Sequence, residues 1–482
     1  MIAESILNIG DSMQKYTAII IGGGPSGHSA AVRIAQMGGR VAIVEKDYIG
    51  GICTNWGCTP SKSMIESAKV GRLVKDAGKY GIKVPAYEVD FKKVAARRDE
   101  VILNTRNFIT DLLNHYKVDI YQGEAEIIDT ATIKVRSGKL DADGFTMHYD
   151  GKETLLETEN IILATGSAPL IPAFVKPNDP TIVSSNRLIS IDRLPKSLTI
   201  IGGGVIGVEF ATIFSNLGSQ VTIVEYLDRV LALMDADISA EITHLMQKNG
   251  VKIYTNHEVQ FAGDGVTRAK NRSNAEILEV KADAILVAIG RRPVQDKAGY
   301  QRISLDFNEK GLTINEYQQT NVPGVWAIGD ATGRSILAHV GIQQGIICAE
   351  NIMAKGSSLR KMNYEVIPAV VYSIPEIVMV GTVPKDTSNV KVVKVPFSAN
   401  LRAGIESYPE GFIKVWIKEN RILAAQVIGH NASEFMQEIT NMIALKTPIE
   451  QVAEIIHAHP TYSEIVRSTL DFALGKAVDF YL

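Results

Sequence analysis

The stretch that decides the fold is AIIIGGGPSGHSAAVRIAQMGGRVAIVEK, Ala18–Lys46. A second stretch, LTIIGGGVIGVEFATIFSNLGSQVTIVEY at Leu198–Tyr226, repeats its pattern without a gap. Each copy predicts an apolar strand, a glycine turn, a helix and a second apolar strand that ends in an acid. The internal duplication therefore predicts an α/β chain with two similar domains.

The glycines and the acid of each copy have separate tasks. The first glycine permits a tight turn between strand and helix, the second lets the backbone approach a pyrophosphate, and the third allows the helix to pack closely on the sheet. The amino end of the helix offers N–H groups to phosphates, and the acid accepts the ribose hydroxyl groups. The residues concerned are Gly22, Gly24, Gly27 and Glu45 in the first copy, and Gly202, Gly204, Gly207 and Glu225 in the second.

These two fingerprints predict two Rossmann-like dinucleotide-binding domains. An acid at the ribose position favours NAD, because a 2′-phosphate would lie against the carboxylate. Arg229 follows Glu225 closely and leaves NADP as an alternative. The fingerprints alone do not assign a particular dinucleotide to either copy, and glycine-rich turns without a nucleotide are the structural alternative.

Length and composition bound the class of protein. The chain has 482 residues, which at about 100–200 residues per domain corresponds to three or so domains. Lys and Arg number 50 against 53 Asp and Glu, so no overall basic charge favours nucleic acid or anionic lipid. The apolar runs are far too short to cross a bilayer, and the first residues lack a basic start followed by an apolar block. We expect a cytoplasmic protein.

Two of the three cysteines lie close together in GGICTNWGCTPSK, Gly50–Lys62. A redox-active disulfide between Cys53 and Cys58 is the favoured interpretation, because closing so small a loop gains little chain entropy and suits a bond that opens and closes. The alternatives are a buried inert pair and a zinc site completed by His457 and His459, although this spacing is not a usual zinc pattern.

The same segment predicts the start of a helix. Pro60 and Ser61 suit a first helical turn, which would place both cysteines at the amino-terminal end. There the helix dipole favours the thiolate, the form that exchanges with a disulfide, and Lys62 adds positive charge. Cys348 falls in an apolar helix and is interpreted as a small core residue. We expect no metal site.

Further landmarks surround the second copy of the repeat. ENIILATGSAP at Glu159–Pro169 and ADAILVAIGRRP at Ala282–Pro293 each predict an apolar strand and a glycine turn, as if one domain were inserted in another. VWAIGDAT at Val325–Thr332 predicts a strand, followed by a helix over Ala338–Met353. The polar stretch Lys355–Asn363 predicts a linker to a separate α+β domain with two amphipathic helices. Helical spacing is also present near Ser63–Tyr80 and Ala95–Tyr116.

Taken together, the cysteine segment, the two fingerprints, AIGRRP, WAIGDAT, PEIVMVG and HAHPTYSE resemble the class I pyridine nucleotide–disulfide oxidoreductases. The resemblance runs from Tyr16 to Leu482, with the motifs in the family's order. It implies an α/β fold with an FAD-binding domain, an NAD-binding domain inserted in it, and a C-terminal α+β dimerisation domain. The expected boundaries are 1–160 and 286–355 for the FAD-binding domain, 161–285 for the NAD-binding domain and 356–482 for the dimerisation domain.

The resemblance also implies the roles of the site residues. FAD and NAD are the expected cofactors, FAD on the first fingerprint and NAD on the second. Cys53 resembles the thiol that exchanges with substrate, and Cys58 the thiol that contacts the flavin. His459 resembles the active-site base, which comes from the other subunit of a homodimer, and Glu464 its carboxylate partner.

The remaining expected residues bind the cofactors. The resemblance places Gly329 and Asp330 on the ribityl chain and pyrophosphate of FAD, and it pairs Lys62 with Glu209 beside the flavin ring. Nearby turns add Thr165, Gly166 and Gly290 to the expected set. Two other histidines, His430 and His457, are interpreted as structural.

Within the family, the motifs are nearest to the members that oxidise protein-bound dihydrolipoamide to lipoamide and reduce NAD to NADH. The implied partner is a lipoyl-bearing protein of a 2-oxo acid dehydrogenase or glycine cleavage complex. Trp56 and Thr59 depart from the smaller aliphatic residues common at these positions, and Trp56 is interpreted as a packing residue. The alternatives are an NAD(P)H-dependent reductase of another disulfide, such as oxidised glutathione, and a catalytically idle flavoprotein redox sensor.

Overall fold

The computed structural model describes residues 15–140, 146–478 and 480, and the chain divides into two compact units. Unit 1 holds the described residues of 1–58, 102–168 and 291–362, and unit 2 those of 59–101, 169–290 and 363–482. The second copy of the repeat therefore lies in a segment that interrupts unit 1 along the chain, as an inserted domain does.

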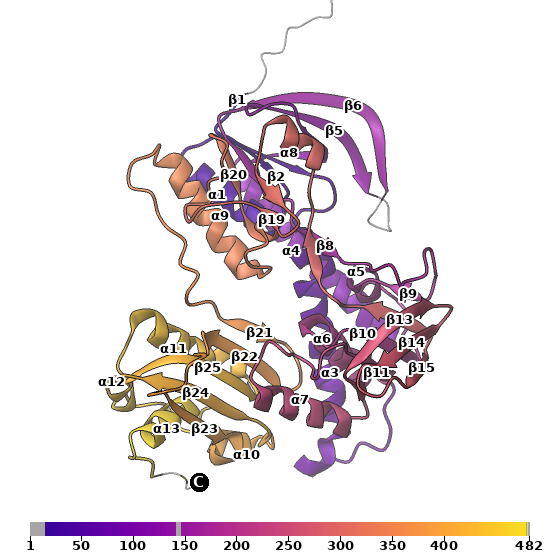
Figure 1. The fold of residues 1–482 in the computed structure, drawn as a ribbon, viewed down its shortest axis with the longest axis vertical. Coiled ribbons are helices and arrows are strands. Elements are labelled where there is room, and N and C mark those ends of the chain that lie inside the picture. Colours follow the sequence, from indigo (N-terminus) through magenta and orange to yellow (C-terminus); the bar gives the residue numbers. More distant parts are fainter. Residues whose placement is uncertain (1–14, 141–145, 479, 481–482) are drawn as a thin grey trace, which may run out of the picture. The chain divides into compact units, whose positions relative to one another are not determined.

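Unit 1 is built on an eight-stranded sheet in the order β1-β6-β5-β4-β3-β2-β7-β20 (Figure 1). Strands β3, β2, β7 and β20 are parallel, with Ile20 of β2 opposite Ile43 of β3 and Ile162 of β7. These strands are short runs of buried apolar residues, as expected for parallel strands covered on both faces. The strands are β1 (Lys15–Tyr16), β2 (Ala18–Ile21), β3 (Val41–Glu45), β4 (Asp119–Ile127), β5 (Thr132–Leu140), β6 (Met147–Thr158), β7 (Ile161–Leu163) and β20 (Val325–Ala327).

Helices α1 (Pro25–Gln36) and α9 (Ala338–Met353) pack side by side against this sheet (Figure 1). Their approach is close because α9 carries Gly345, where a β-carbon would lie 2.4 Å from the backbone oxygen of Ser26 in α1. A second core cluster joins the sheet to Tyr300, which is fully buried in α8 (Lys297–Arg302). The helix predicted over Ala338–Met353 is confirmed at both ends.

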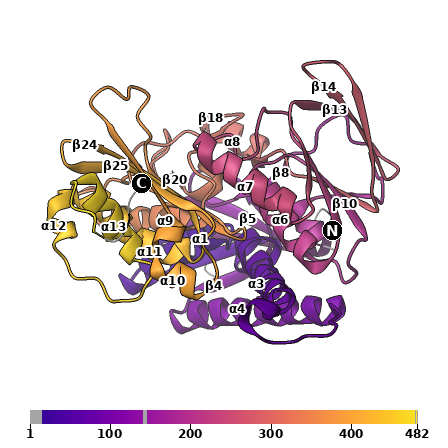
Figure 2. The same cartoon turned by 90° about the horizontal axis from the view of Figure 1, so that it is seen from below.

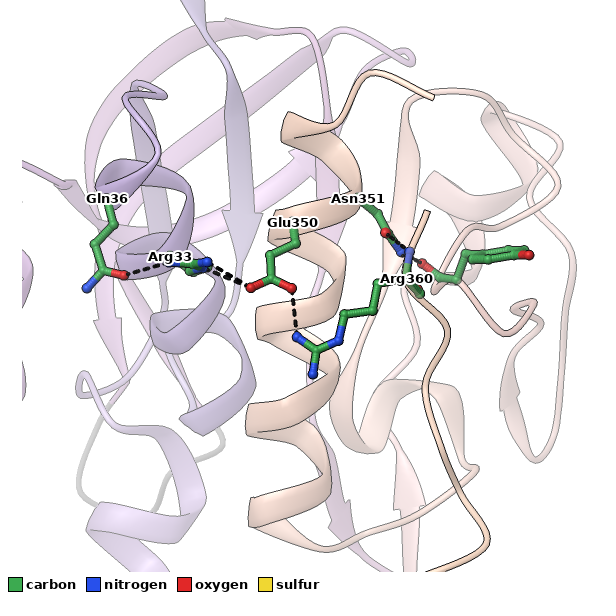
Figure 3. A network of polar contacts seen from close by, with 6 residues as sticks. Arg33, Gln36, Glu350, Asn351 and Arg360 are labelled. Carbon is green, nitrogen blue, oxygen red and sulfur yellow. Dashed lines mark hydrogen bonds and ion pairs between the residues drawn. The ribbon is translucent and has the colours of Figure 1, made fainter. Parts of the chain in front are cut away.

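A carboxylate joins α1, α9 and the segment that follows α9 (Figure 3). One oxygen of Glu350 accepts two hydrogen bonds from Arg33 of α1, at 2.9 and 3.1 Å, and the other accepts one from Arg360 at 2.7 Å. Asn351 holds the backbone of Arg360 by bonds in both directions, at 2.7 and 2.9 Å. Burial acts to raise the pKa of Glu350, but the bonds from Arg360 and Arg33 lower it overall. The predicted linker, Lys355–Asn363, is therefore tied to α9 through Arg360.

Unit 2 contains a parallel five-stranded sheet in the order β12-β11-β10-β16-β9. Strands β10 and β11 belong to the second copy of the repeat and are joined by α6 (Val205–Leu217), which is buried along most of its length. A separate antiparallel sheet is formed by β13, β14 and β15. The bounds are β9 (Ile182–Val183), β10 (Ser197–Ile201), β11 (Gln220–Val224), β12 (Lys252–Tyr254), β13 (His257–Gly263), β14 (Val266–Asn271), β15 (Ile277–Lys281), β16 (Ala284–Val287), α5 (Ser185–Ile189) and α7 (Ala236–Lys248).

The C-terminal part of unit 2 is an antiparallel sheet in the order β21-β22-β25-β24-β23 (Figure 1). Helices α11 (Ala432–Leu445) and α13 (Glu464–Ala473) pack against it around one apolar core (Figure 2). These are the two amphipathic helices predicted from the sequence, and the structure adds shorter helices beside them. The other elements are β21 (Ala369–Val371), β22 (Glu376–Gly381), β23 (Lys391–Pro396), β24 (Phe412–Lys418), β25 (Arg421–Gly429), α10 (Leu401–Ile405), α12 (Ile449–Ala453) and the 3₁₀ turn η3 (Phe397–Ala399).

The predicted fold class is confirmed, and two helices begin earlier than expected. Helix α3 (Cys58–Lys75) begins at the second cysteine, and α4 (Phe91–His115) begins after Asp90, whose carboxylate accepts the N–H group of Lys93 as a cap. The predicted domain boundaries stay a prediction. Short elements complete the chain: α2 (Gly51–Trp56), η1 (Ala77–Tyr80), η2 (Gly329–Thr332), β8 (Ser167–Pro169), β17 (Arg291–Pro293), β18 (Phe307–Asn308) and β19 (Gly311–Leu312).

Candidate functional site

The first glycine loop fits a bound pyrophosphate. Gly22 has φ +109°, and a β-carbon there would lie 2.2 Å from the oxygen of Ala164. A β-carbon on Gly27 would lie 1.9 Å from the oxygen of Gly22, so glycine lets α1 start this close to β2. A β-carbon on Gly24 would meet no described atom nearer than 4.0 Å, which leaves the amino end of α1 open to a phosphate group.

The second loop repeats this geometry. Gly202 has φ +106°, and a β-carbon there would lie 2.5 Å from the oxygen of Ala288. A β-carbon on Gly207 would lie 2.0 Å from the oxygen of Gly202, whereas the positions beside Gly204 and Gly290 have no described atom within 4 Å. Both loops therefore combine a strained turn with an open face, which is the shape that a dinucleotide needs.

Glu45 and Glu225 close their loops in the same way. One oxygen of Glu45 accepts the N–H group of Gly23 at 2.7 Å, and the other accepts the N–H group two residues further along the chain at 2.8 Å. Glu225 binds the N–H group of Gly203 and, at 2.7 Å, the one two residues further along. Each oxygen keeps a lone pair for a ribose hydroxyl group. Burial raises the pKa of Glu45.

The alternative of a 2′-phosphate partner is weakened by the contacts of Arg229. Its guanidinium lies 3.2 Å from the carboxylate of Asp228 and donates to the carbonyl oxygen of Ala232 at 3.2 Å. These bonds hold the side chain within its own loop. The geometry therefore favours NAD over NADP beside Glu225.

The cysteine segment is anchored on the first glycine loop. The N–H group of Gly50 donates to the oxygen of Gly23 at 2.9 Å. Gly51 has φ +57° and packs so closely that a β-carbon there would lie 2.7 Å from the Cα of Gly24. Cys53 is partly buried on α2, and Cys58 is exposed. The two candidate redox thiols thus lie in a segment attached to the candidate FAD loop.

Of the two cysteines expected at the amino-terminal end of the helix that holds Pro60 and Ser61, the structure places only Cys58 on that helix. Cys58 is the first residue of α3, but Cys53 lies on the separate helix α2. Gly57, with φ −139° and ψ −106°, separates the helices. A β-carbon on Gly57 would lie 3.0 Å from the oxygen of Ile52, so a larger residue would crowd the break. The amino-terminal dipole of α3 consequently acts on Cys58.

The turns around the candidate flavin residues are tied together within unit 1. Gly166 has φ +72°, its oxygen accepts the N–H group of Val294 at 3.0 Å, and Thr165 donates to the Val294 oxygen at 2.9 Å. Gly329 has φ +68° and donates its N–H group to the side chain of Gln344 at 2.7 Å. These bonds fix the backbone from which Asp330 projects.

Sequence reasoning missed one charged residue in this region. Arg291 donates to the hydroxyl and the carbonyl oxygen of Ser167 at 2.8 and 2.6 Å, and the Ser167 hydroxyl donates to Asp330 at 2.5 Å. Burial lowers the pKa of Arg291, while the negative charges of Asp330 and Cys58 act in the opposite direction. The motif AIGRRP contains Arg291 directly after Gly290, so a charged residue beside this predicted turn was visible in the sequence.

The ion pair predicted between Lys62 and Glu209 is present. The ammonium group lies 3.0 and 3.1 Å from the two carboxylate oxygens, and Glu209 also accepts the N–H group of Tyr372 at 3.0 Å. Lys62 lies 4.4 Å from the centre of the Tyr372 ring. Because the Glu209 side chain is only 8% exposed, these partners satisfy its oxygens in place of water. The location of the pair beside a flavin stays a prediction.

The contact predicted between His459 and Glu464 is present in unit 2, and its role in proton transfer stays a prediction. Nδ1 of His459 lies 2.8 Å from one oxygen of Glu464, whose other oxygen accepts the N–H group of Thr461 at 2.7 Å. Burial acts to raise the pKa of Glu464, but the bonds from Thr461 and His459 lower it overall. His459 thus has Nδ1 on the carboxylate, and 63% of its side chain is exposed.

Models of a known protein family match most of the chain. A family model described as pyridine nucleotide-disulphide oxidoreductase matches residues 16–345, and the dimerisation-domain model of that family matches residues 367–470. The chain belongs to the pyridine nucleotide–disulfide oxidoreductases. This membership confirms the predicted family, the enzyme class and the cofactors FAD and NAD. The dimerisation domain supports the expected homodimer.

The similarity of this oxidoreductase to known relatives covers nearly its whole length. Dihydrolipoyl dehydrogenase of Chlamydia pneumoniae is 35% identical over 459 residues, 94% of this chain and 95% of that protein. Dihydrolipoyl dehydrogenase of Geobacillus stearothermophilus is 35% identical over 481 residues, 98% of each. A solved copper(II) complex of the HOCl-induced flavoprotein disulfide reductase RclA from Escherichia coli has a TM-score of 0.83 at 26% identity and covers 95% of this chain and 100% of its own.

Other residues of this oxidoreductase have structural partners. Cys348 is buried in α9, and burial raises the pKa of its thiol. His457 lies 3.0 Å from Glu438, and His430 stacks on Tyr408 with 4.0 Å between ring centres. Among the residues described, no three His, Cys, Asp or Glu side chains are grouped to hold a metal ion. None of the described helices has the length and apolar character needed to cross a membrane.

Proposed function

We propose that this oxidoreductase is a dihydrolipoyl dehydrogenase, which oxidises protein-bound dihydrolipoamide to lipoamide and reduces NAD to NADH. The observation that carries the proposal is the attachment of the Cys53–Cys58 segment to the first glycine loop through Gly50 and Gly23. The two relatives described above carry this name at 35% identity over nearly full length, which supports the substrate.

The cofactor sites follow from the two loops. FAD would be held by the first loop, Glu45 and Asp330, and NAD by the second loop and Glu225. When bound, FAD supplies the chemistry that thiols lack, because it accepts the electron pair of a dithiol and passes it to NAD as a hydride. Arg291 would orient Asp330 through Ser167.

The protein's own residues would carry out the thiol exchange. A substrate thiolate attacks the sulfur of Cys53, the Cys53–Cys58 bond breaks, and Cys58 leaves as a thiolate. The second substrate thiol then displaces Cys53, so that the substrate ends as a disulfide and the enzyme holds both electrons as a dithiol. His459 takes the proton that each attacking thiol must lose, and Glu464 stabilises the imidazolium.

The quaternary arrangement completes the proposal. The chain would work as a homodimer in which His459 serves the cysteines of the partner subunit. Its partner would be a lipoyl-bearing protein of a 2-oxo acid dehydrogenase or glycine cleavage complex. The cytoplasmic localisation expected from the sequence stays a prediction.

The test is steady-state reduction of NAD by dihydrolipoamide, followed by NADH absorbance. We expect C53S to lower turnover by about 100-fold or more, because the exchanging thiolate is lost. C348A, at the buried cysteine outside the segment, should keep the wild-type rate. A C53S protein that turns over dihydrolipoamide normally would contradict the proposal.

A second candidate is a reductase of another disulfide. Two observations support this second candidate. The structure is similar to that of RclA, and Trp56 lies between the cysteines with Thr59 directly after them. Such an enzyme would oxidise NADH or NADPH with a disulfide such as oxidised glutathione faster than it oxidises dihydrolipoamide. An idle redox sensor would turn over neither substrate, so the same two assays separate all three functions.

A further inference from the structure

The residue immediately before Gly57, between the two cysteines, is bonded to the segment that follows β3. Trp56 is the last residue of α2, and its indole N–H group donates to the carboxylate of Asp47 at 2.7 Å. Asp47 lies two residues after Glu45, the last residue of β3, and belongs to unit 1 with both cysteines. The bond therefore joins the segment between Cys53 and Cys58 to the segment just after β3.

Asp47 is itself held by the candidate FAD site. Its N–H group donates to Glu45 at 2.8 Å, and its carbonyl oxygen accepts a bond from Gln122 of β4 at 2.9 Å. Glu45 in turn accepts the N–H group of Gly23. A continuous series of hydrogen bonds thus runs from the glycine loop through Glu45 and Asp47 to Trp56.

The surroundings of Asp47 favour a fixed geometry. Burial raises the pKa of Asp47, while the bond from Trp56 and the charge of Arg106 act to lower it. Arg106 of α4 also donates to Asn55 at 2.9 Å, and its guanidinium lies 3.6 Å from the centre of the Tyr48 ring. The acceptor of the Trp56 bond is therefore a partly buried carboxylate near the positive charge of Arg106, where a lost hydrogen bond is costly.

The first half of the segment has a different support. The side-chain amide of Asn55 donates to the carbonyl oxygens of Ile49 and Gly51 at 3.1 and 2.9 Å, so it fixes the start of α2. Gly57 then ends α2 with non-helical φ and ψ, so the helix is interrupted before Cys58. Trp56 is the last side chain before this break, so its bond to Asp47 ties the end of α2 to unit 1 one residue before Gly57 and two before Cys58.

We propose that Trp56 is a positioning residue for the redox pair and that its bond to Asp47 sets the dithiol–disulfide equilibrium of Cys53 and Cys58. The inference rests on the proposed function only in taking these cysteines as the redox pair. Holding Gly57 and Cys58 in place raises the effective concentration of one sulfur at the other, which favours the disulfide. Removing the bond should shift the equilibrium toward the dithiol.

The test is thiol–disulfide exchange of the FAD-containing protein with mixtures of reduced and oxidised dithiothreitol. The protein dithiol becomes a disulfide, and oxidised dithiothreitol takes up the two electrons and two protons. Acid quenching, alkylation and mass spectrometry of the Cys53–Cys58 peptide give the ratio of the two forms. Neither dihydrolipoamide nor NAD is needed.

Four variants isolate the bond. W56F and D47A should each shift the ratio toward the dithiol by about tenfold, the scale of one hydrogen bond to a charged group. The double variant W56F/D47A should shift it no further than either alone, because both changes remove the same bond. D47N keeps an acceptor oxygen and should stay within about twofold of wild type.

The matched control is W326F. Trp326 lies in the same unit, and its indole N–H group donates to Asn160 at 3.0 Å, so W326F also removes one indole hydrogen bond while keeping a ring. Its ratio should equal that of wild type. The melting temperature of each variant checks that it is folded.

Three results would overturn the inference. They are no shift in W56F, additive shifts of W56F and D47A, or a D47N shift as large as that of D47A. A wild-type protein that shows the expected shifts but does not oxidise dihydrolipoamide would overturn only the proposed function. A wild-type protein that never forms the Cys53–Cys58 disulfide would overturn both.

Discussion

At the scale of single residues, Arg291 is the side chain whose loss should be most informative. It donates two bonds to Ser167, which bonds to Asp330, so R291M removes a partly buried cation and leaves the Ser167 acceptors without their donor. We expect FAD to bind about tenfold more weakly, the scale of a lost charge-assisted hydrogen bond. Titration of the FAD-free protein with FAD, followed by flavin fluorescence, measures this.

The neighbouring arginine provides the control. Arg292 is exposed, so R292M removes the same charge from the adjacent position without touching Ser167. Its affinity for FAD should equal that of wild type. Equal losses in R291M and R292M would mean that overall charge, and not the Ser167 bond, governs FAD binding.

Glu464 gives a prediction about pH. Its pKa in the folded protein lies below the ordinary value of 4.5, so its bonds to Thr461 and His459 stabilise the fold fully above that value. As the pH falls through the lower folded pKa, the carboxylate is protonated and this stability is lost. The difference in melting temperature between wild type and E464Q should therefore shrink from about pH 6 to about pH 3.5.

The exposed carboxylate of Glu454 serves as a reference in the same unit. E454Q should melt at the wild-type temperature across the same range. A difference between wild type and E464Q that is independent of pH would show that Glu464 acts through packing and not through its charge.

At the scale of elements, local sequence patterns predicted the strands, glycine turns and helices that neighbouring residues determine. The strands and helices of the two glycine motifs and the helix Ala338–Met353 follow from apolar periodicity and glycine positions, and the structure contains them. The division of the cysteine segment into α2 and α3 was not predicted. Pro60 and Ser61 were predicted to lie in a first helical turn, and α3 does begin just before them, at Cys58. The end of α2 at Gly57, directly before Cys58, was not expected.

Local sequence patterns do not predict contacts between residues that are distant in the sequence. The cysteine pair was predicted from its spacing, whereas His459 and Glu464 were predicted only because their motif resembles that of a family. The bonds of Ser167 to Arg291 and of Trp56 to Asp47 depend on where the folded backbone brings these side chains. Trp56, interpreted from the sequence as a packing residue, is in the structure also a hydrogen-bond donor to a partly buried carboxylate.

At the scale of the whole molecule, the duplication separates two binding sites that share one geometry. The first loop belongs to unit 1 and the second to unit 2. Glu45 and Glu225 each accept the N–H group of the central glycine of their own loop, so equivalent substitutions at the two acids make a matched pair. Since the two loops look alike, only binding measurements can establish that they have different occupants.

E45Q and E225Q provide that measurement. Glutamine replaces one of the two acceptor oxygens with an N–H donor. This donor would face either the N–H group of the central glycine or the backbone N–H group two residues beyond the acid. Each substitution should therefore disturb its own loop and remove an acceptor for a ribose hydroxyl group. We expect E45Q to weaken FAD binding about tenfold and leave the rise in melting temperature caused by NAD unchanged. E225Q should do the reverse, with full FAD content by flavin absorbance and a smaller rise with NAD. If either variant weakened both cofactors, or if the two effects were exchanged, the assignment of FAD to the first loop and NAD to the second would be wrong.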